Sequence, residues 1–130
     1  MIVLDASALL ELLLGTARGK KVAAAIAAPD VLLAAPHLID LEVAQVLRRL
    51  VARGEVSPRR AEQALDDLAA LGLSRYGHEE LLPRIWELRA NLTAYDAAYV
   101  ALAEATFATL VTGDAKLATA EHRATVRVVA

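Results

Sequence analysis

The sequence contains no cysteine, which excludes disulfide bonds, thiolate chemistry and zinc sites built on sulfur. It also has no long hydrophobic run, because uncharged stretches such as Val22–Pro29 fall well short of the roughly 20 apolar residues that a transmembrane helix needs. The first residues, Met1–Asp5, include neither a basic segment nor a cleavable apolar region, so we expect no signal peptide. Together these absences predict a cytoplasmic protein.

Positive charge is scarce as well. The chain of 130 residues has a formal net charge of −2 and an isoelectric point near 5.9. A protein that binds nucleic acid through its own charge is usually basic. Any phosphate-bearing substrate must therefore be attracted by local basic patches or by bound metal ions.

Apolar side chains, by contrast, are abundant. They make up 57% of the sequence, which rules out a disordered chain, and the length predicts one domain over residues 1–130. Much of the apolar content is alanine, which favours closely packed helices. Those helices offer more apolar surface than one small core needs, which predicts a homodimer.

Short apolar runs alternate with helical patterns along the chain. The predicted strands are Ile2–Leu4, Val31–Leu33, Leu110–Thr112 and Val126–Val129, with a weaker candidate at Leu73–Tyr76. The predicted helices run from Pro36 and His37 to about Arg53, from Ser57 and Pro58 to near Gly72, from after Gly77 to about Ala90, and from Thr93 to about Ala105. This alternation predicts a parallel α/β sheet with helices on both faces.

Two aspartates follow predicted strands. In a parallel sheet, ligands bind beyond the carboxyl ends of the strands. Asp5 follows the first strand and Asp114 follows the strand Leu110–Thr112, so both should face the same edge. The structural alternative is that each aspartate only caps the helix after it.

Two further acids lie within predicted helices. Glu42 lies at one margin of the apolar face of its helix and Asp40 at the opposite margin, so periodicity does not choose between them. Asp96 lies in a helix with almost no other charge, where an isolated carboxylate needs a partner or a metal. It also follows Thr93 by three residues, which is the spacing of a helix capping box.

A cluster of such acids predicts a cation site. Two carboxylates at ~4 Å repel each other by about 1–4 kcal/mol at effective dielectrics between those of water and a protein surface. A divalent cation relieves that repulsion, and oxygen-only ligands point to Mg²⁺ or Mn²⁺. Ions held by carboxylates can polarise a phosphoryl oxygen and activate a water molecule.

Four segments resemble the motifs of PIN-domain nucleases, in the order that this family has them. Leu4–Leu9 resembles the opening motif, and Pro36–Val43 resembles the second acidic motif, with its glutamate at Glu42. Leu92–Tyr99 is similar to the third motif as found in VapC-like members, and Thr112–Leu117 is similar to the fourth. Each motif alone is a loose pattern, but four in a chain this short are specific.

The resemblance implies a PIN-like three-layer α/β/α sandwich with a mostly parallel central sheet. It also implies RNA cleavage that depends on Mg²⁺ or Mn²⁺, by the toxin of a toxin–antitoxin pair that a cognate antitoxin inhibits. It implies that the metal is held, directly or through water, by Asp5, Glu42, Asp96 and Asp114. By the same resemblance, the hydroxyls of Ser7 and Thr112 orient those carboxylates, and a water molecule is the nucleophile.

The remaining polar and aromatic residues are assigned by position. The candidates for contact with RNA phosphates are Arg18, Lys20, Lys21 and Lys116. Solvated helix faces are the simpler interpretation for Arg48, Arg49, Arg53, Arg59 and Arg60. We expect surface or capping roles for His37, His78 and His122. Core packing is expected for Tyr76, Trp86, Tyr95, Tyr99 and Phe107.

Other functions account for the pattern less well. A haloacid-dehalogenase-like phosphatase would have a second aspartate where this chain has Ser7. A receiver domain would need an acidic pair that is absent. The serious alternative is a PIN-like domain that has lost catalysis and serves in RNA binding or protein docking. The presence of all four acids argues against that loss, and a metal-dependence assay on RNA separates the two.

Overall fold

The computed structural model describes all residues from 1 to 130. Its centre is a five-stranded sheet with the strand order β3-β2-β1-β4-β5, and every neighbouring pair is parallel. The strands are β1 (Ile2–Leu4), β2 (Leu33–Pro36), β3 (Ser74–Tyr76), β4 (Thr109–Thr112) and β5 (Thr125–Val128). The predicted parallel sheet is therefore confirmed.

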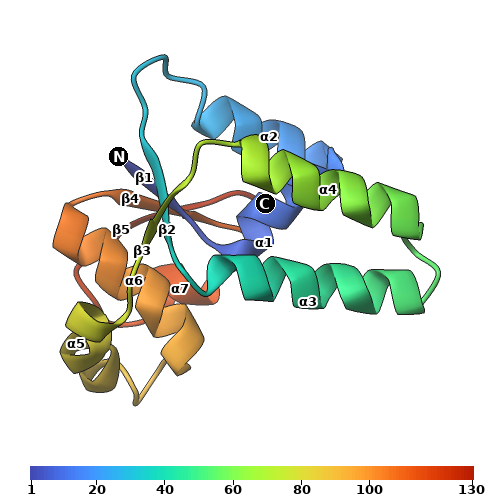
Figure 1. The fold of residues 1–130 in the computed structure, drawn as a ribbon. Coiled ribbons are helices and arrows are strands. Elements are labelled where there is room, and N and C mark those ends of the chain that lie inside the picture. The colour runs from blue at the N-terminus through green and yellow to red at the C-terminus, as the bar shows by residue number, and fades with distance from the viewer.

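Helices cover both faces of this sheet (Figure 1). They are α1 (Ala6–Leu14), α2 (Ala17–Ala25), α3 (Ile39–Ala52), α4 (Pro58–Ala70), α5 (Leu82–Glu87), α6 (Ala94–Thr106) and α7 (Lys116–Thr119), with a 3-10 turn, η1, at Glu79–Leu81. One layer consists of α1 and α2 with α3 and α4 packed on them, and the other consists of α6 and α5. The three-layer α/β/α arrangement is confirmed.

The core lies between β1 and the helices on its two sides. Val3 and Leu4 of the central strand are fully buried, as are Ala34 and Ala35 of β2. Helix α6 is buried continuously from Ala97 to Ala103, and most of these side chains are small. Small side chains let the helix axis approach the sheet closely, which is why the alanine-rich composition still gives a packed interior.

Several helices begin where the sequence signals predict. The hydroxyl of Ser57 accepts a hydrogen bond from the backbone N–H of Arg60 at 3.1 Å, and Pro58 occupies the first turn of α4. Thr93 accepts from the N–H of Asp96 at 3.1 Å and starts α6. Helix α3 has no cap from its own first residue, and the N–H of Leu38 donates to Nε2 of His78 at 3.2 Å instead.

Two expectations are wrong at element boundaries, and one helix was not expected. Strand β2 covers Leu33–Pro36 and not Val31–Leu33, because the buried residues are the two alanines that follow Leu33. The helix expected to reach about Ala90 ends at Glu87 and starts only after a 3-10 turn. Helix α2 was not expected: Gly15, at φ 65°, ends α1, and Thr16, the next residue, caps the start of α2.

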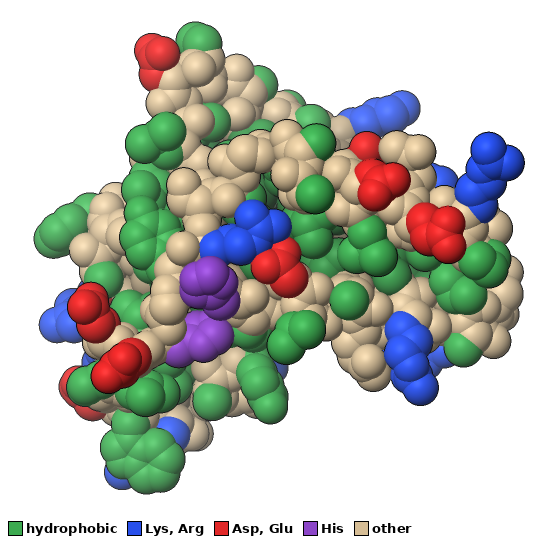
Figure 2. Space-filling model, in the orientation of Figure 1, with side chains coloured by type: hydrophobic (Ala, Val, Ile, Leu, Met, Phe, Trp, Pro, Cys, Tyr) green, Lys and Arg blue, Asp and Glu red, His purple; other side chains and the backbone are tan.

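The surface carries several large apolar side chains. Core packing is confirmed for Tyr99, which is 1% exposed, but it is wrong for Trp86, Tyr95 and Phe107, which are 67%, 65% and 97% exposed. Phe107 ends α6 in the left-handed conformation at φ 55°, outside the core. Hydrophobic side chains also lie between α3 and α4, on the right of Figure 2. No helix is long and apolar enough to cross a membrane.

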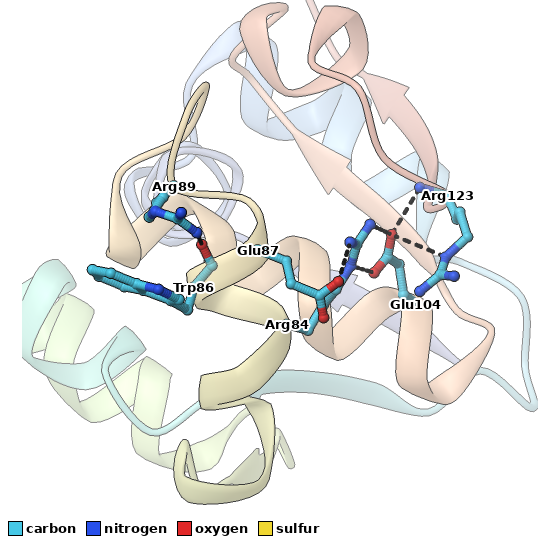
Figure 3. Close-up of polar contacts among 6 residues, drawn as sticks. All are labelled: Arg84, Trp86, Glu87, Arg89, Glu104 and Arg123. Carbon is cyan, nitrogen blue, oxygen red and sulfur yellow. Dashed lines mark hydrogen bonds and ion pairs between the residues drawn. The ribbon is translucent and has the colours of Figure 1, made fainter.

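A buried carboxylate ties three elements together at the edge of the sheet where the strands begin (Figure 3). Glu104 of α6 accepts from Nε and Nη2 of Arg84 on α5 at 2.7 and 3.0 Å. It also accepts from the backbone N–H of Arg123, ahead of β5, at 2.7 Å. Burial alone would raise the pKa of Glu104, but the hydrogen bonds from these two arginines outweigh it and lower the pKa below its ordinary value.

Candidate functional site

The carboxyl edge of the central strands carries the predicted aspartates. β1 and β4 are neighbours, with Leu4 opposite Val111, so the residues that follow them emerge side by side. Asp5 directly follows β1 and starts α1 by accepting from the N–H of Ala8 at 2.9 Å. Asp114 follows β4 by two residues. The strand order thus brings the two loops together, as the sequence pattern predicts.

Hydroxyl groups fix the carboxylate of Asp5, which is 6% exposed. Ser7 donates to Oδ1 at 2.7 Å, and the hydroxyl of Thr112 donates to Oδ2 in a short hydrogen bond. The same hydroxyls also hold the loop after β4, because Ser7 accepts from the N–H of Gly113 at 3.0 Å and Thr112 accepts from that of Asp114 at 2.9 Å. The carboxylate of Asp5 therefore caps α1 and is also held by two hydroxyls at the edge of the sheet.

Glu42 and Asp40, between which helical periodicity does not choose, have different partners in the structure. Asp40 forms a two-pronged pair with Arg75 of β3, at 2.7 and 2.8 Å. Glu42 is half-buried, and its Oε1 accepts from the hydroxyl of Tyr99 at 2.6 Å. Asp40 thus anchors the start of α3, while Glu42 faces α6 and the acids near it.

Three of the four acids lie close enough to repel one another. Burial raises the pKa of Asp5, and the nearby charge of Asp96 adds to the increase against three hydrogen bonds that oppose it. Burial also raises the pKa of Glu42, and the charges of Asp96 and Asp5 raise it further. Asp5 follows β1, Glu42 lies in α3 and Asp96 lies in α6, so the fold gathers negative charge from three separate segments.

Asp96 and Asp114 are linked through Lys116. The side chain of Asp96 is 29% exposed, and its Oδ2 lies 3.6 Å from Nζ of Lys116. The backbone N–H of Lys116 donates to Oδ1 of Asp114 at 2.9 Å. Asp96 is thus less deeply buried than an apolar helix predicted, because it lies in the first turn of α6, before the buried stretch begins.

The predicted basic residues do not all lie at this site. A β-carbon placed on Gly113 would lie 3.8 Å from Nη1 of Arg18, so this guanidinium reaches the loop after β4. Lys116 lies beside Asp96. Nζ of Lys21 donates to the backbone carbonyl of Ala130 at 2.8 Å, and Lys20 is exposed on α2. The positive charge at the site therefore comes from α2 and α7.

The chemistry of these donors fits a hard divalent cation. All the candidate ligands are carboxylate oxygens, and buried carboxylates with raised pKa values gain from a nearby positive charge. The side chains as placed do not form a complete coordination shell, because no three His, Asp or Glu side chains are positioned to hold one ion together. Donors from water or substrate would have to complete it, as is usual for Mg²⁺.

The sequence does not predict the hydrogen bond between Tyr99 and Glu42. The position of Tyr99 in an apolar helix gives the same signal as any aromatic residue of the core. The one available hint is its polarity: it is a tyrosine one turn after Asp96, in a helix whose next residues are all apolar. The partner of its hydroxyl comes from 57 positions earlier in the chain, which no local pattern reports.

Comparison with known proteins shows the family. A family model described as PIN domain matches residues 2–122. The chain is 46% identical to ribonuclease VapC9 of Mycobacterium tuberculosis over 117 residues, which cover 90% of this chain and 88% of that protein. It is 37% identical to ribonuclease VapC12 of the same organism over 131 residues, which cover 100% of both.

Solved structures agree in fold. A protein from Pyrobaculum aerophilum is similar with a TM-score of 0.67 and 26% identity, covering 96% of this chain and 89% of that one. VapC20 of Mycobacterium tuberculosis, a sarcin–ricin loop cleaving toxin, is similar with a TM-score of 0.72 and 16% identity, covering 95% of this chain and 97% of that one. By its sequence and its fold, this chain belongs to the PIN-domain family, among the VapC ribonucleases.

Proposed function

We propose that this chain is a metal-dependent endoribonuclease, the toxin of a toxin–antitoxin pair, which hydrolyses RNA at Asp5, Glu42, Asp96 and Asp114. One observation carries the chemical part of the proposal. Three carboxylates from three distant segments are gathered at one edge of the sheet, although burial, and to a lesser extent their mutual charge, raises the pKa values of Asp5 and Glu42. A fold tolerates such repulsion where a cation and a substrate use it.

In this proposal the four acids hold Mg²⁺ or Mn²⁺, directly or through water. When bound, the ion polarises the phosphoryl oxygen and activates the attacking water. Ser7 and Thr112 keep the Asp5 carboxylate in one orientation, since each donates to a different oxygen. Water is the nucleophile, so no side chain forms a covalent intermediate.

The RNA is held through its phosphates. Arg18 and Lys116 provide charge beside the acids, and Lys20 and Lys21 extend that charge along α2. Lys116 lies near Asp96 and can exchange this contact for a phosphate when a metal neutralises the carboxylate. The enzyme would act in the cytoplasm, where its RNA substrate is.

The direct test is cleavage of RNA by the purified chain with Mg²⁺ or Mn²⁺ and with EDTA. Asp96→Asn should abolish cleavage and leave the fold intact, whereas Asp66→Asn, on the exposed face of α4, should cut at the wild-type rate. RNA that is bound but not cut with either metal would instead identify the catalytically inactive RNA-binding alternative. Wild-type cleavage by the Asp96 variant would contradict the site assignment.

Metal binding can be measured without RNA. A ligand that binds only the folded state stabilises it by roughly 2.7 kcal/mol at 100 times its dissociation constant. For a chain of this length, that corresponds to an increase of about 5–15 °C in melting temperature. A melting temperature that does not change with Mn²⁺ or with EDTA would argue against the metal site.

Two protein partners are part of the proposal. The exposed apolar side chains, among them Leu82, Trp86 and Phe107, support a homodimer, and light scattering should then give twice the monomer mass of 13.8 kDa. The antitoxin would place an arginine or lysine of its tail near Asp5 and Asp96. Its affinity should fall when that residue becomes alanine and as Mn²⁺ increases. If neither the substitution nor Mn²⁺ changes the affinity, the antitoxin inhibits at a position away from the acids.

A further inference from the structure

Tyr99 is a deeply buried residue whose side-chain hydroxyl contacts Glu42, one of the four candidate acids. It lies in the middle of α6, is 1% exposed, and donates from its hydroxyl to Oε1 of Glu42 at 2.6 Å. This hydrogen bond joins two helices of different layers, because α3 packs on α1 while α6 covers the opposite face of β1.

Packing alone does not account for a tyrosine at this position. Phenylalanine would fill nearly the same volume and would bring no polar atom into the interior. A buried hydroxyl without a partner costs free energy, so its partner is part of the reason for the residue. Here the partner is the carboxylate of Glu42, and no buried side-chain polar atom in the structure is left without a hydrogen bond.

The orientation of the Glu42 carboxylate depends on this one hydrogen bond, whereas the Asp5 carboxylate is held by several. Asp5 has a short side chain and three donors, from Ser7, Ala8 and Thr112. Glu42 has a longer side chain with three rotatable bonds, and the hydroxyl of Tyr99 is its single hydrogen-bond donor in the structure. Without that donor no hydrogen bond holds its carboxylate in one rotamer.

We propose that Tyr99 is the positioning residue for Glu42: its hydroxyl fixes one carboxylate oxygen and leaves the other free for the metal ion. The inference rests on the proposed function, because it assigns Tyr99 to the same metal site. Tyr99 touches neither RNA nor metal in this scheme and acts only through Glu42. Groups that orient metal ligands in this way typically change metal affinity or activity by about 10–100-fold when they are removed.

The test is the Mn²⁺ affinity of Tyr99→Phe, measured by calorimetry and by the dependence of melting temperature on Mn²⁺. We expect the affinity to fall about 10-fold or more, while the variant keeps the wild-type circular dichroism spectrum. Tyr76→Phe is the matched control, since it removes the hydroxyl of a half-buried tyrosine that lines a surface pocket away from the acids, together with Leu102 and Thr106. Its Mn²⁺ affinity should equal that of the wild type.

A double-mutant cycle separates positioning from a general loss of packing. In a Glu42→Gln background, Tyr99→Phe should have no further effect on Mn²⁺ affinity, because the carboxylate that it positions is gone. If Tyr99→Phe fails to fold, Glu42→Asp tests the same contact from the other side. The shorter acid keeps its charge but moves away from the hydroxyl, and it should lose affinity by a similar factor.

The outcomes distinguish the inference from the proposed function. If the wild type neither binds Mn²⁺ nor cleaves RNA, the proposed function fails. If the wild type binds Mn²⁺ and folded Tyr99→Phe binds it equally well, only the inference fails. A loss of affinity that persists in the Glu42→Gln background would also overturn it, because Tyr99 would then act through another route.

Discussion

Replacing Glu104 with glutamine tests how much of the stability depends on the contact between α5, α6 and the segment before β5. The Glu104 side chain is 7% exposed and meets Arg84 in a paired contact at 2.7 and 3.0 Å. Glutamine has the same shape and keeps one acceptor oxygen. It removes the negative charge and replaces the second acceptor with a donor that faces the guanidinium.

The magnitude follows from these contacts. A hydrogen bond to a charged group contributes about 1.5–3 kcal/mol. The Arg84 side chain is 25% exposed, so water can replace part of what it loses, which places the expected loss in free energy of unfolding near 2 kcal/mol. For a chain of this length, that is a decrease in melting temperature of about 6–10 °C.

Glu87→Gln is the matched control, since it makes the same chemical change beside the same arginine. Glu87 is 65% exposed and lies 3.6 Å from Arg84, and exposed ion pairs of this kind contribute about 0–1 kcal/mol. Thermal unfolding at pH 7 should therefore show a large loss for Glu104→Gln and almost none for Glu87→Gln. Equal melting temperatures for the two variants would refute the reasoning.

The same comparison has a pH dependence with a defined sign. The pKa of Glu104 in the folded state lies below its ordinary value, so the folded state binds the proton less tightly than the unfolded state. The stability that this acid contributes is complete above its unfolded pKa and is lost as the pH falls through the folded pKa. The gap between the wild type and Glu104→Gln should shrink in acid, and a constant gap would contradict the assignment.

Three further predictions concern other parts of the molecule. A β-carbon on Gly19 would lie 2.0 Å from the backbone carbonyl oxygen of Glu11 in α1, so Gly19→Ala should lower the free energy of unfolding by about 1–3 kcal/mol. Gly77→Ala, where the space around the residue is open, should not lower it. The pKa of Glu42 is raised in the folded state, so its ionisation destabilises that state increasingly as the pH rises from the pKa of the unfolded chain to that of the folded chain. Without metal, Glu42→Gln should therefore have a higher melting temperature than the wild type at high pH but not in acid. Arg18→Gln should weaken RNA binding and reduce its salt slope by about one in filter binding, whereas substitution of glutamine for Arg53, the exposed residue that follows α3, should change neither.

The positions of the two aspartates that follow strands could be predicted from the sequence, because the direction of the strands alone fixes the edge at which they lie. Once Asp5 and Asp114 follow two strands of a parallel sheet, their edge is fixed, and the structure places them at the same edge. Asp96 is a candidate from sequence because a lone charge is conspicuous in an apolar helix. These signals are local, and each survives errors of two or three residues in the boundaries of the elements.

The hydrogen-bond partners of the acids in α3 could not be predicted from the sequence, because they come from other segments of the chain. Asp40 and Glu42 flank the same apolar face of α3, and only Arg75 on β3 and Tyr99 on α6 separate their roles. The exposure of Phe107 was missed for a similar reason, since hydrophobicity indicates a preference for burial but not whether another element lies opposite. Periodicity thus identifies a face of a helix, and the tertiary fold decides what that face meets.

The turn from β4 into α7 positions Asp5 and Asp114 through three consecutive residues, Thr112, Gly113 and Asp114. The hydroxyl of Thr112 both donates to Asp5 and accepts from the N–H of Asp114. Gly113 donates to Ser7, and a β-carbon there would lie only 3.3 Å from Oγ of Ser7. Each position therefore needs its own residue type: a hydroxyl, then no side chain, then a carboxylate. A sequence that kept Asp114 but lost the two residues before it would keep the acid and lose its placement.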